Sequence, residues 1–277
     1  MTRTHNAYHL GDNLVHLNFL RRVALSMPDR QFIHAARWNN IPQMRDVVSD
    51  VKNIKLISLE EDKYYAYADY TTPLIKDSVN AWRGAGGDWY NHPDRNDFVK
   101  YHVDHWFPRI SGMMGVDCPI KRTEDMLFDY PQLCSWQHPE LHSQIIVINS
   151  RPMSGQFIAY DDYALCDLAV NLWRQNDSLI TTSPIPKELI PRGTIKCTAD
   201  YGLSVSQIGN LSLHARCIVM VSTGPSWPTF NVWNTITVRH RIILIDQEQI
   251  NLSPNTVHCK SVREAVDKLT EYGYLQG

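Results

Sequence analysis

The pattern of hydrophobic and polar positions divides this 277-residue chain into short strands and longer helices. Uninterrupted apolar runs predict buried strands, whereas apolar residues that recur every three or four positions predict helices. The first part of the chain predicts, in order, a helix around 14–24, a strand at 31–36, a helix at 41–51 and a strand at 54–59. Short strands that alternate with helices are typical of a parallel, doubly wound sheet.

The alternation weakens and then returns in the second half of the chain. The segment 64–141 is dense in aromatics, histidines and glycines, and it predicts loops with one helix at about 95–114. The pattern beyond it predicts further strands at 143–150, 179–185, 194–198, 217–222 and 241–246. It also predicts helices at 162–176, 204–215 and 261–275. The chain therefore contains two rounds of α/β structure.

Two rounds of α/β structure predict two Rossmann-like domains facing a cleft, with a seam near 136–143. We expect an N-terminal domain, 1–140, that carries the aromatic-rich insertion, and a second domain, 141–260, that binds the ligand. The closing segment, 261–277, is expected as a separate helix that could pack back on the N-terminal domain.

Composition narrows the class of protein and its partners. Hydrophobic residues make up 43% of the chain, and the net charge of −2 lacks the basic excess that nucleic-acid binding requires. No segment has the ~18 consecutive apolar residues of a membrane span. The opening MTRTHNAYHLGD lacks the apolar run of a signal peptide, and the six cysteines show no CxxC spacing. We therefore expect no nucleic-acid partner, no transmembrane segment and a cytoplasmic location.

Small hydroxyl residues and a glycine follow a buried strand in the stretch CIVMVSTGPSWPTFNVWN. In open α/β sheets, ligands bind at the carboxyl ends of the strands, which makes Ser222, Thr223 and Gly224 candidates for contacting a phosphate. A helix expected after Pro228 would direct the positive end of its dipole at the same anion. A plain tight turn would also produce this pattern.

Arg151 follows the strand at 143–150 and could hold the same anion. Its planar guanidinium presents a fork of donors that fits a diphosphate bidentately. Because the net charge of the chain is close to zero, an anion has to be held by such local groups. The alternative is an ordinary surface arginine.

Asp12 lies beside a glycine at the start of the first predicted helix, in HLGDNLVHLNFL. A carboxylate at the mouth of a cleft could act as a general base on a hydroxyl nucleophile. An aspartate at this position equally suits the N-cap of the helix. The GxGxxG fingerprint of dinucleotide-binding domains is absent from this segment.

Two segments resemble known glycosyltransferases. The G-D pair before a leucine-spaced helix resembles the start of glycosyltransferase family 9, the heptosyltransferase type. The segment LSVSQIGNLSLHARCIVMVSTGPSWPTFN resembles a later motif of that family and is similar to the distal motif of NodZ-type fucosyltransferases. Both groups have the two-domain GT-B fold and are inverting and metal-independent. The resemblance covers roughly the first 60 residues and 143–260.

The resemblance implies an enzyme that moves a sugar from a nucleoside diphosphate sugar to a hydroxyl of a glycan acceptor, with no cofactor. Asp12 matches the catalytic base of the heptosyltransferase type. Thr223 and Gly224 match the turn that contacts the phosphate, with Ser222 where family 9 usually has an acidic residue. Arg151 matches the arginine that holds the diphosphate in the fucosyltransferases.

Loops and aromatic side chains supply further candidates. Nucleoside binding is expected from loops at the strand ends, namely Ser183, Thr198, Asp200, Tyr201 and Ser206. Acceptor binding is expected from His9, Trp82, Trp89 and Tyr90. Each nucleoside candidate could equally be ordinary loop or capping chemistry, and the aromatics could equally form a small core of their own.

The histidine-rich motifs HVDH and HPELH invite a metal interpretation, but neither matches HExxH, and the sequence predicts no metal site. Two other function classes stay open. One is a non-catalytic protein of the same fold that binds sugar nucleotides or glycans. The other is a sugar-nucleotide epimerase of the GT-B type.

Overall fold

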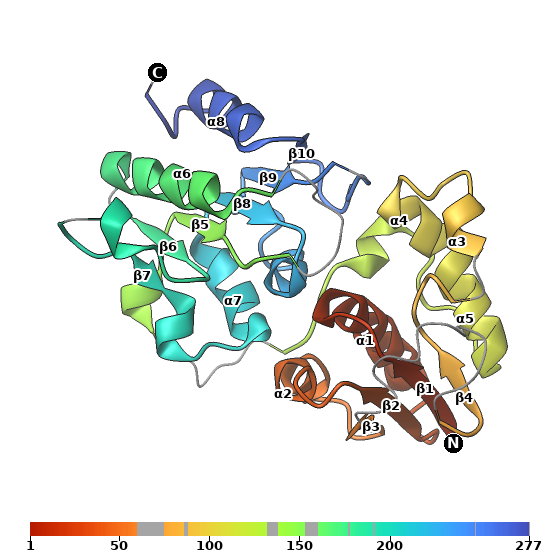
Figure 1. The fold of residues 1–277 in the computed structure, drawn as a ribbon. Coiled ribbons are helices and arrows are strands. Elements are labelled where there is room, and N and C mark those ends of the chain that lie inside the picture. Colours follow the sequence, from red (N-terminus) through yellow and green to blue (C-terminus); the bar gives the residue numbers. More distant parts are fainter. Residues whose placement is uncertain are drawn as a thin grey trace. The chain divides into compact units, whose positions relative to one another are not determined.

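The computed structural model describes residues 1–59, 75–85, 88–131, 138–152, 160–176, 178–190, 192–246 and 248–276. The chain forms two compact units, each built on its own parallel sheet (Figure 1), which confirms the α/β class with two Rossmann-like domains. The first unit comprises Met1–Pro131 with Ile250–Leu252, and the second comprises Gln132–Gln249 with Ser253–Gly277. In the described part of the chain, no helix has both the length and the apolar character that a bilayer crossing requires.

The first unit has a four-stranded sheet in the order β3-β2-β1-β4. Its strands are β1 (Thr2–Asn6), β2 (Phe32–Ala36), β3 (Ile54–Ser58) and β4 (Ser78–Asn80). Its helices are α1 (Leu10–Ser26), α2 (Ile41–Met44), α3 (Asp88–Asn91), α4 (Phe98–Tyr101) and α5 (Phe107–Met114), and a 3₁₀ turn, Arg45–Val48, continues α2. Apolar runs predicted β2 and β3. They did not predict β1 or β4, because the buried residues of β1 include the polar Thr4, His5 and Asn6.

The predicted helix at 95–114 is present and contains an irregularity. A π-helical stretch, His102–Trp106, connects α4 to α5 without a break in the chain of helical turns. The helix ends at Gly115, whose φ of 63° is in the left-handed region. Short π-helical stretches inside α-helices are frequent at functional sites, and this one carries two residues of the pocket described below.

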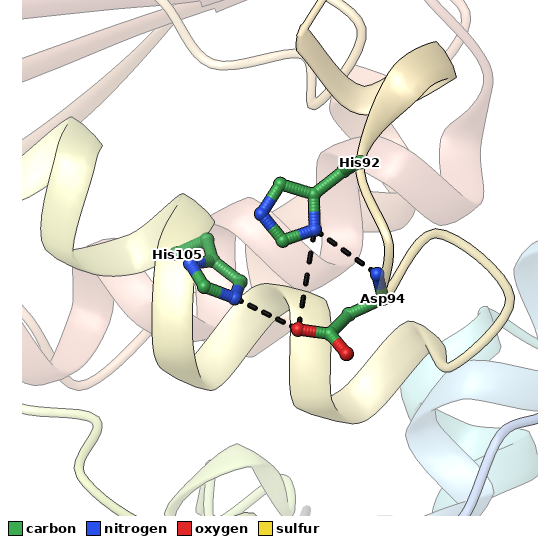
Figure 2. Close-up of side chains that lie close together, drawn as sticks. All are labelled: His92, Asp94 and His105. Carbon is green, nitrogen blue, oxygen red and sulfur yellow. Dashed lines mark hydrogen bonds and ion pairs between the residues drawn. The ribbon is translucent and has the colours of Figure 1, made fainter.

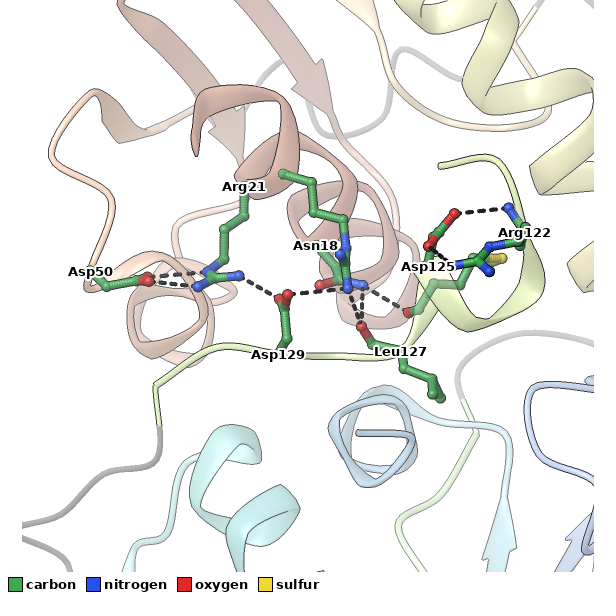
Figure 3. A network of polar contacts seen from close by, with 9 residues as sticks. Asn18, Arg21, Asp50, Arg122, Asp125, Leu127 and Asp129 are labelled. Carbon is green, nitrogen blue, oxygen red and sulfur yellow. Dashed lines mark hydrogen bonds and ion pairs between the residues drawn. The ribbon is translucent and has the colours of Figure 1, made fainter. Parts of the chain in front are cut away.

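A network of charged side chains holds the end of the first unit against α1 (Figure 3). Nε and Nη2 of the buried Arg21 donate to Oδ1 and Oδ2 of Asp50 at 3.1 and 2.5 Å, and Nη1 bonds to Asp129. Arg22 approaches the other oxygen of Asp129 at 3.2 Å. Because Arg21 has two carboxylate partners, its charge is compensated inside the unit. The network fixes the segment 126–131 along α1.

The second unit has a six-stranded sheet in the order β10-β9-β8-β5-β6-β7. Its strands are β5 (Ile145–Ile148), β6 (Leu179–Thr181), β7 (Lys196–Cys197), β8 (Cys217–Val221), β9 (His240–Leu244) and β10 (Thr256–Cys259). Its helices are α6 (Asp162–Gln175), α7 (Val205–Leu211) and α8 (Val262–Glu271). Helices α6 and α8 share one face of the sheet, and α7 lies on the opposite face (Figure 1). The sheet is therefore buried on both faces, as its continuous apolar runs predicted.

Helix α8 belongs to the second unit. Its Ala265 and Leu269 are buried in one core with Val219 of β8 and Leu165 of α6. The sequence analysis set this helix apart as a segment that could pack back on the N-terminal domain. Its apolar stripe packs on the sheet of the second unit, and packing on the N-terminal domain stays a prediction.

Candidate active site

A pocket opens in the first unit at the carboxyl ends of two neighbouring strands. Strand β1 leads into α1, and β4 leads into the loop at 81–85; the two strands pair in parallel, so both connections start at one edge of the sheet. The helical segment from α4 to α5 closes a third side. The pocket is lined by Gly11, Asp12, Val15, His16, Ala81, Arg83, Phe98, His102, Trp106 and Phe107.

Asp12 is the acidic group of this pocket. Helix α1 begins at Leu10, with His9 in the N-cap position, so Asp12 lies in the first turn and is not the N-cap that one interpretation of the sequence predicted. A carboxylate in the first turn is stabilised by the positive end of the helix dipole. The sequence therefore located a carboxylate at a strand-to-helix junction, where α/β sheets usually bind their ligands.

Arg83 is the basic group of the pocket, and the sequence analysis missed it. The residue is only 7% exposed, and its guanidinium carbon lies 4.4 Å from the ring centre of Trp89 and 4.9 Å from that of Phe98. Two aromatic faces at these distances stabilise the cation and restrict its movement. The pocket thus combines a carboxylate and an arginine within one concave surface.

The pocket histidines are neutral. Burial lowers the pKa of His102 to about 3, with a smaller contribution from the positive charge of Arg83, and burial together with His5 lowers that of His16 to about 3. Nδ1 of His102 lies 2.7 Å from the carbonyl oxygen of Phe98 and therefore donates to it. These imidazoles can contact a polar ligand without adding charge to the pocket.

The four predicted acceptor residues do not line this pocket. Trp82 is buried and stacks on Tyr8, with ring centres 3.8 Å apart and an interplanar angle of 4°. One ring face of Trp82 is thus used inside the unit, and Arg83 covers a face of Trp89. Tyr90 is 47% exposed, and its ring meets that of Trp89 edge to face at 5.0 Å. The assignment of these residues and of His9 to acceptor binding stays a prediction.

In the second unit, the predicted phosphate residues lie at the ends of adjacent strands. Strands β5 and β8 pair in parallel with Ile148 opposite Met220, so Arg151 and Thr223 each follow three residues beyond that pair. Arg151 is exposed and Ser222 is buried. The hydroxyl oxygen of Thr223 is buried and has no hydrogen-bond partner in the described part of the chain. A buried hydroxyl without a partner is costly and is available to a ligand.

The helix predicted after Pro228 is absent. A 3₁₀ helix of 6 residues, Gly224–Thr229, begins directly after Thr223 and contains Pro228. The described residues 230–239 form turns and bends, with an isolated β-bridge at Asn231 and no helix. Ser226 closes its first turn, since its hydroxyl accepts from the N–H of Thr223 at 3.1 Å and donates to its carbonyl oxygen at 2.6 Å. So short a helix has little dipole, and the binding of an anion at this turn stays a prediction that would have to rest on side chains.

The predicted nucleoside residues separate into buried and exposed ones. Thr198 and Ser206 are buried, and the hydroxyl of Thr198 donates to the carbonyl oxygen of Thr182 at 3.4 Å. The backbone of Ser183 is held by Asn149, which accepts from its N–H at 2.8 Å. Asp200 and Tyr201 are exposed. For these five residues, nucleoside binding stays a prediction. Asp200 and Tyr201, which lie on the 3₁₀ helix Thr198–Tyr201 after β7, are the ones accessible to a ligand from solvent.

The histidines of the HVDH and HPELH motifs lie in separate surroundings. His102 faces the pocket, whereas His105 lies beside residues outside its own motif, His92 and Asp94. In the second motif, His138 pairs with Glu140 at 2.8 Å.

No protein-family model and no curated protein matches this chain. Solved structures do. E. coli ADP-heptose lps heptosyltransferase II is 14% identical, with 98% of each chain covered and a TM-score of 0.56. E. coli heptosyltransferase WaaC with ADP is 11% identical, covering 98% of this chain and 97% of that chain, with a TM-score of 0.54. A family 9 glycosyltransferase from Veillonella parvula is 10% identical, covering 100% of this chain and 90% of that chain, with a TM-score of 0.55.

These likenesses confirm the predicted GT-B fold and its resemblance to structures of family 9. At identities of 10–14% they concern the fold alone, because one fold can carry many activities. The resemblance to NodZ-type fucosyltransferases stays a prediction.

Proposed function

We propose that this chain is an inverting, metal-independent glycosyltransferase that moves a sugar from a nucleoside diphosphate sugar to a hydroxyl of a carbohydrate acceptor. The observation that carries the proposal is the placement of Arg151 and Thr223 at the ends of neighbouring strands, with the buried Thr223 hydroxyl unpartnered among the residues that the structure describes. The structurally similar WaaC was solved with ADP, which supports a nucleoside diphosphate as the ligand.

The donor half of the reaction is an electrostatic task. Cleavage of the sugar–phosphate bond leaves a nucleoside diphosphate with added negative charge, and groups that stabilise this charge lower the barrier. Arg151 can bind two phosphate oxygens through its parallel N–H groups. The hydroxyl of Thr223 can donate one further hydrogen bond from its buried position. In this proposal, protein side chains stabilise the negative charge of the leaving diphosphate.

The acceptor half requires a base, and we assign this role to Asp12. Its carboxylate would take the proton of the acceptor hydroxyl while the oxygen attacks the anomeric carbon. Attack from the side opposite the leaving diphosphate inverts the configuration at that carbon. The N–H of the neutral His102 is used by the carbonyl of Phe98, so its Nε2 offers the pocket an acceptor, and the cation of Arg83 offers donors for sugar hydroxyls. Trp106 adds an aromatic surface to the lining.

A cytoplasmic location belongs to the same proposal. The described cysteines, Cys118, Cys166, Cys197, Cys217 and Cys259, are free and buried. Free thiols are the rule in reducing compartments.

Binding of nucleoside diphosphates to purified protein tests the donor site. Arg151→Ala should weaken ADP, GDP or UDP binding about 10–100-fold, because a hydrogen bond to a charged group contributes about 1.5–3 kcal/mol. Thr223→Val should weaken it less, and Arg263→Ala, which removes an exposed arginine of α8, should leave it unchanged. Isothermal titration calorimetry measures all three. Equal affinity in the wild-type protein and the Arg151→Ala variant would contradict the donor assignment.

Product analysis with a panel of nucleoside diphosphate sugars separates the function classes. A transferase releases the diphosphate faster when an acceptor glycan is present. An epimerase converts the donor in the absence of an acceptor, and a binding protein shows affinity without turnover. The proposal expects the first result, and either of the other two would replace it.

A further inference from the structure

Three potential metal ligands come together outside the pocket (Figure 2). His92 and Asp94 lie on the turn that follows α3, and His105 projects from the π-helical stretch. Nε2 of His105 lies 3.0 Å from Oδ2 of Asp94, and Nδ1 of His92 lies 4.0 Å from the same oxygen. One ligand atom from each residue falls within 4.8 Å of the other two. The sequence hides this group, because His105 belongs to the HVDH motif whereas His92 and Asp94 lie outside both histidine motifs.

These separations are close to those of ligands around one small cation. Bonds of about 2.0–2.1 Å in tetrahedral geometry place neighbouring ligand atoms roughly 3.3 Å apart. The separations of 3.0 and 4.0 Å lie on either side of this value, so small side-chain rotations would be enough to bind an ion. Nδ1 of His92 is unprotonated, because it accepts the backbone N–H of Asp94 at 3.1 Å, and its lone pair must leave this hydrogen bond when the nitrogen binds an ion.

We propose that His92, Asp94 and His105 form a binding site for a divalent transition-metal ion, and we expect Zn²⁺ to be the ion bound. Two imidazoles and one carboxylate suit zinc and its neighbours in the first transition series, whereas Mg²⁺ and Ca²⁺ prefer oxygen ligands alone. The side chain of His105 is 40% exposed, so an ion can enter from solvent and keep water on its remaining positions.

Lys100 is the group that opposes cation binding. Its ammonium nitrogen lies 2.6 Å from Oδ1 of Asp94, the oxygen that faces away from His105. The pair leaves Oδ2 for a metal, but the positive charge of Lys100 lowers the affinity for any second cation. The proposal therefore predicts a site whose affinity is limited by one removable charge.

The position of the site indicates a structural role. His105 belongs to the same π-helical stretch as His102 and Trp106, which line the pocket around Asp12. An ion held by all three ligands would tie the turn at 92–94 to this helix and fix the wall of the pocket. The inference stands independently of the proposed glycosyl transfer, in which no step uses the ion.

Calorimetric titration of the full-length, tag-free, chelator-treated chain with Zn²⁺ tests the site. We expect saturable binding of one equivalent. His105→Ala and His92→Ala should each weaken it by more than the roughly 10–100-fold that loss of an outer-shell partner costs. His138→Ala, a partly exposed histidine of the second unit, is the matched control and should bind zinc as the wild type does. Wild-type protein without saturable binding would overturn the proposal.

Lys100→Ala separates a metal site from a set of ordinary polar contacts. Removal of the competing charge should tighten zinc binding about 2–5-fold, in line with the strength of an exposed ion pair. If His105→Ala binds zinc as tightly as the wild type, or if Lys100→Ala binds it no more tightly, the three residues are not the ligands.

Discussion

At the scale of single residues, a chain of buried polar groups holds the first turn of α1. Nε2 of His34 lies 3.0 Å from the amide oxygen of Asn13 and donates to it, which leaves Nδ1 to accept from the hydroxyl of Thr4 at 2.9 Å. Thr4 in turn lies 3.3 Å from Nε2 of His16. This arrangement requires neutral imidazoles. These hydrogen bonds position Asn13, the residue that follows Asp12.

The same histidines predict a loss of stability in acid. Burial lowers the pKa of His5 to about 4 and that of His16 to about 3, and it places that of His34 well below 6.5. In the unfolded chain these groups bind protons near pH 6.5, so the unfolded state holds more protons than the folded state as the pH falls below 6.5. The free energy of unfolding should therefore decrease from pH 6.5 towards pH 4.

Urea unfolding at a series of pH values measures this dependence. His16→Leu should reduce the slope between pH 6.5 and 4, since it removes one group with a lowered pKa. His138→Gln, which alters a partly exposed histidine, serves as the control and should keep the wild-type slope. A wild-type stability that stays constant over this range would contradict the assignment of neutral, buried imidazoles.

Single residues could be singled out from the sequence only where they follow a recognisable element end. Asp12 and Arg151 were singled out because each stands beside a predicted strand or helix boundary, and their roles stay predictions. Arg83 was not found, because its role depends on two aromatic rings that folding brings to it. The group of His92 and His105 was missed for the same reason.

At the scale of elements, apolar runs were sufficient to predict the strands whose buried residues are apolar, such as β5 and β8. They failed at β1, a central strand that buries Thr4 and His5 and pairs them through hydrogen bonds. They also failed at Pro228, because a proline that can start a helix also fits inside a short 3₁₀ turn. Local pattern could not distinguish these two outcomes, which tertiary packing decides.

The end of α5 offers a matched pair of glycine substitutions. Gly115 has a φ of 63°, so Gly115→Ala should lower the free energy of unfolding by about 1 kcal/mol through backbone strain. Gly112 lies inside the helix with open space around it, so Gly112→Ala should raise stability by about 0.5–1 kcal/mol. Equilibrium unfolding of both variants checks the opposite signs. Two effects of the same sign would mean that the helix ends elsewhere.

At the scale of the whole molecule, the two α/β units and their fold were predictable from the alternation of strands and helices. The ends of the units were not, since the short piece Ile250–Leu252 belongs to the first unit although it is surrounded by sequence of the second. The assignment of this piece to the first unit depends on contacts between distant parts of the chain, which a local sequence pattern does not reveal.

The most direct test of the account is the turnover of Asp12→Asn with donor and acceptor, measured together with its donor affinity. We expect transfer to fall about 10²–10⁴-fold, the usual contribution of a general base, while the dissociation constant of the nucleoside diphosphate stays within about twofold of the wild type. Asp29→Asn, which alters an exposed aspartate of the same unit, should retain full activity. An Asp12→Asn variant that transfers sugar at the wild-type rate would contradict the central claim.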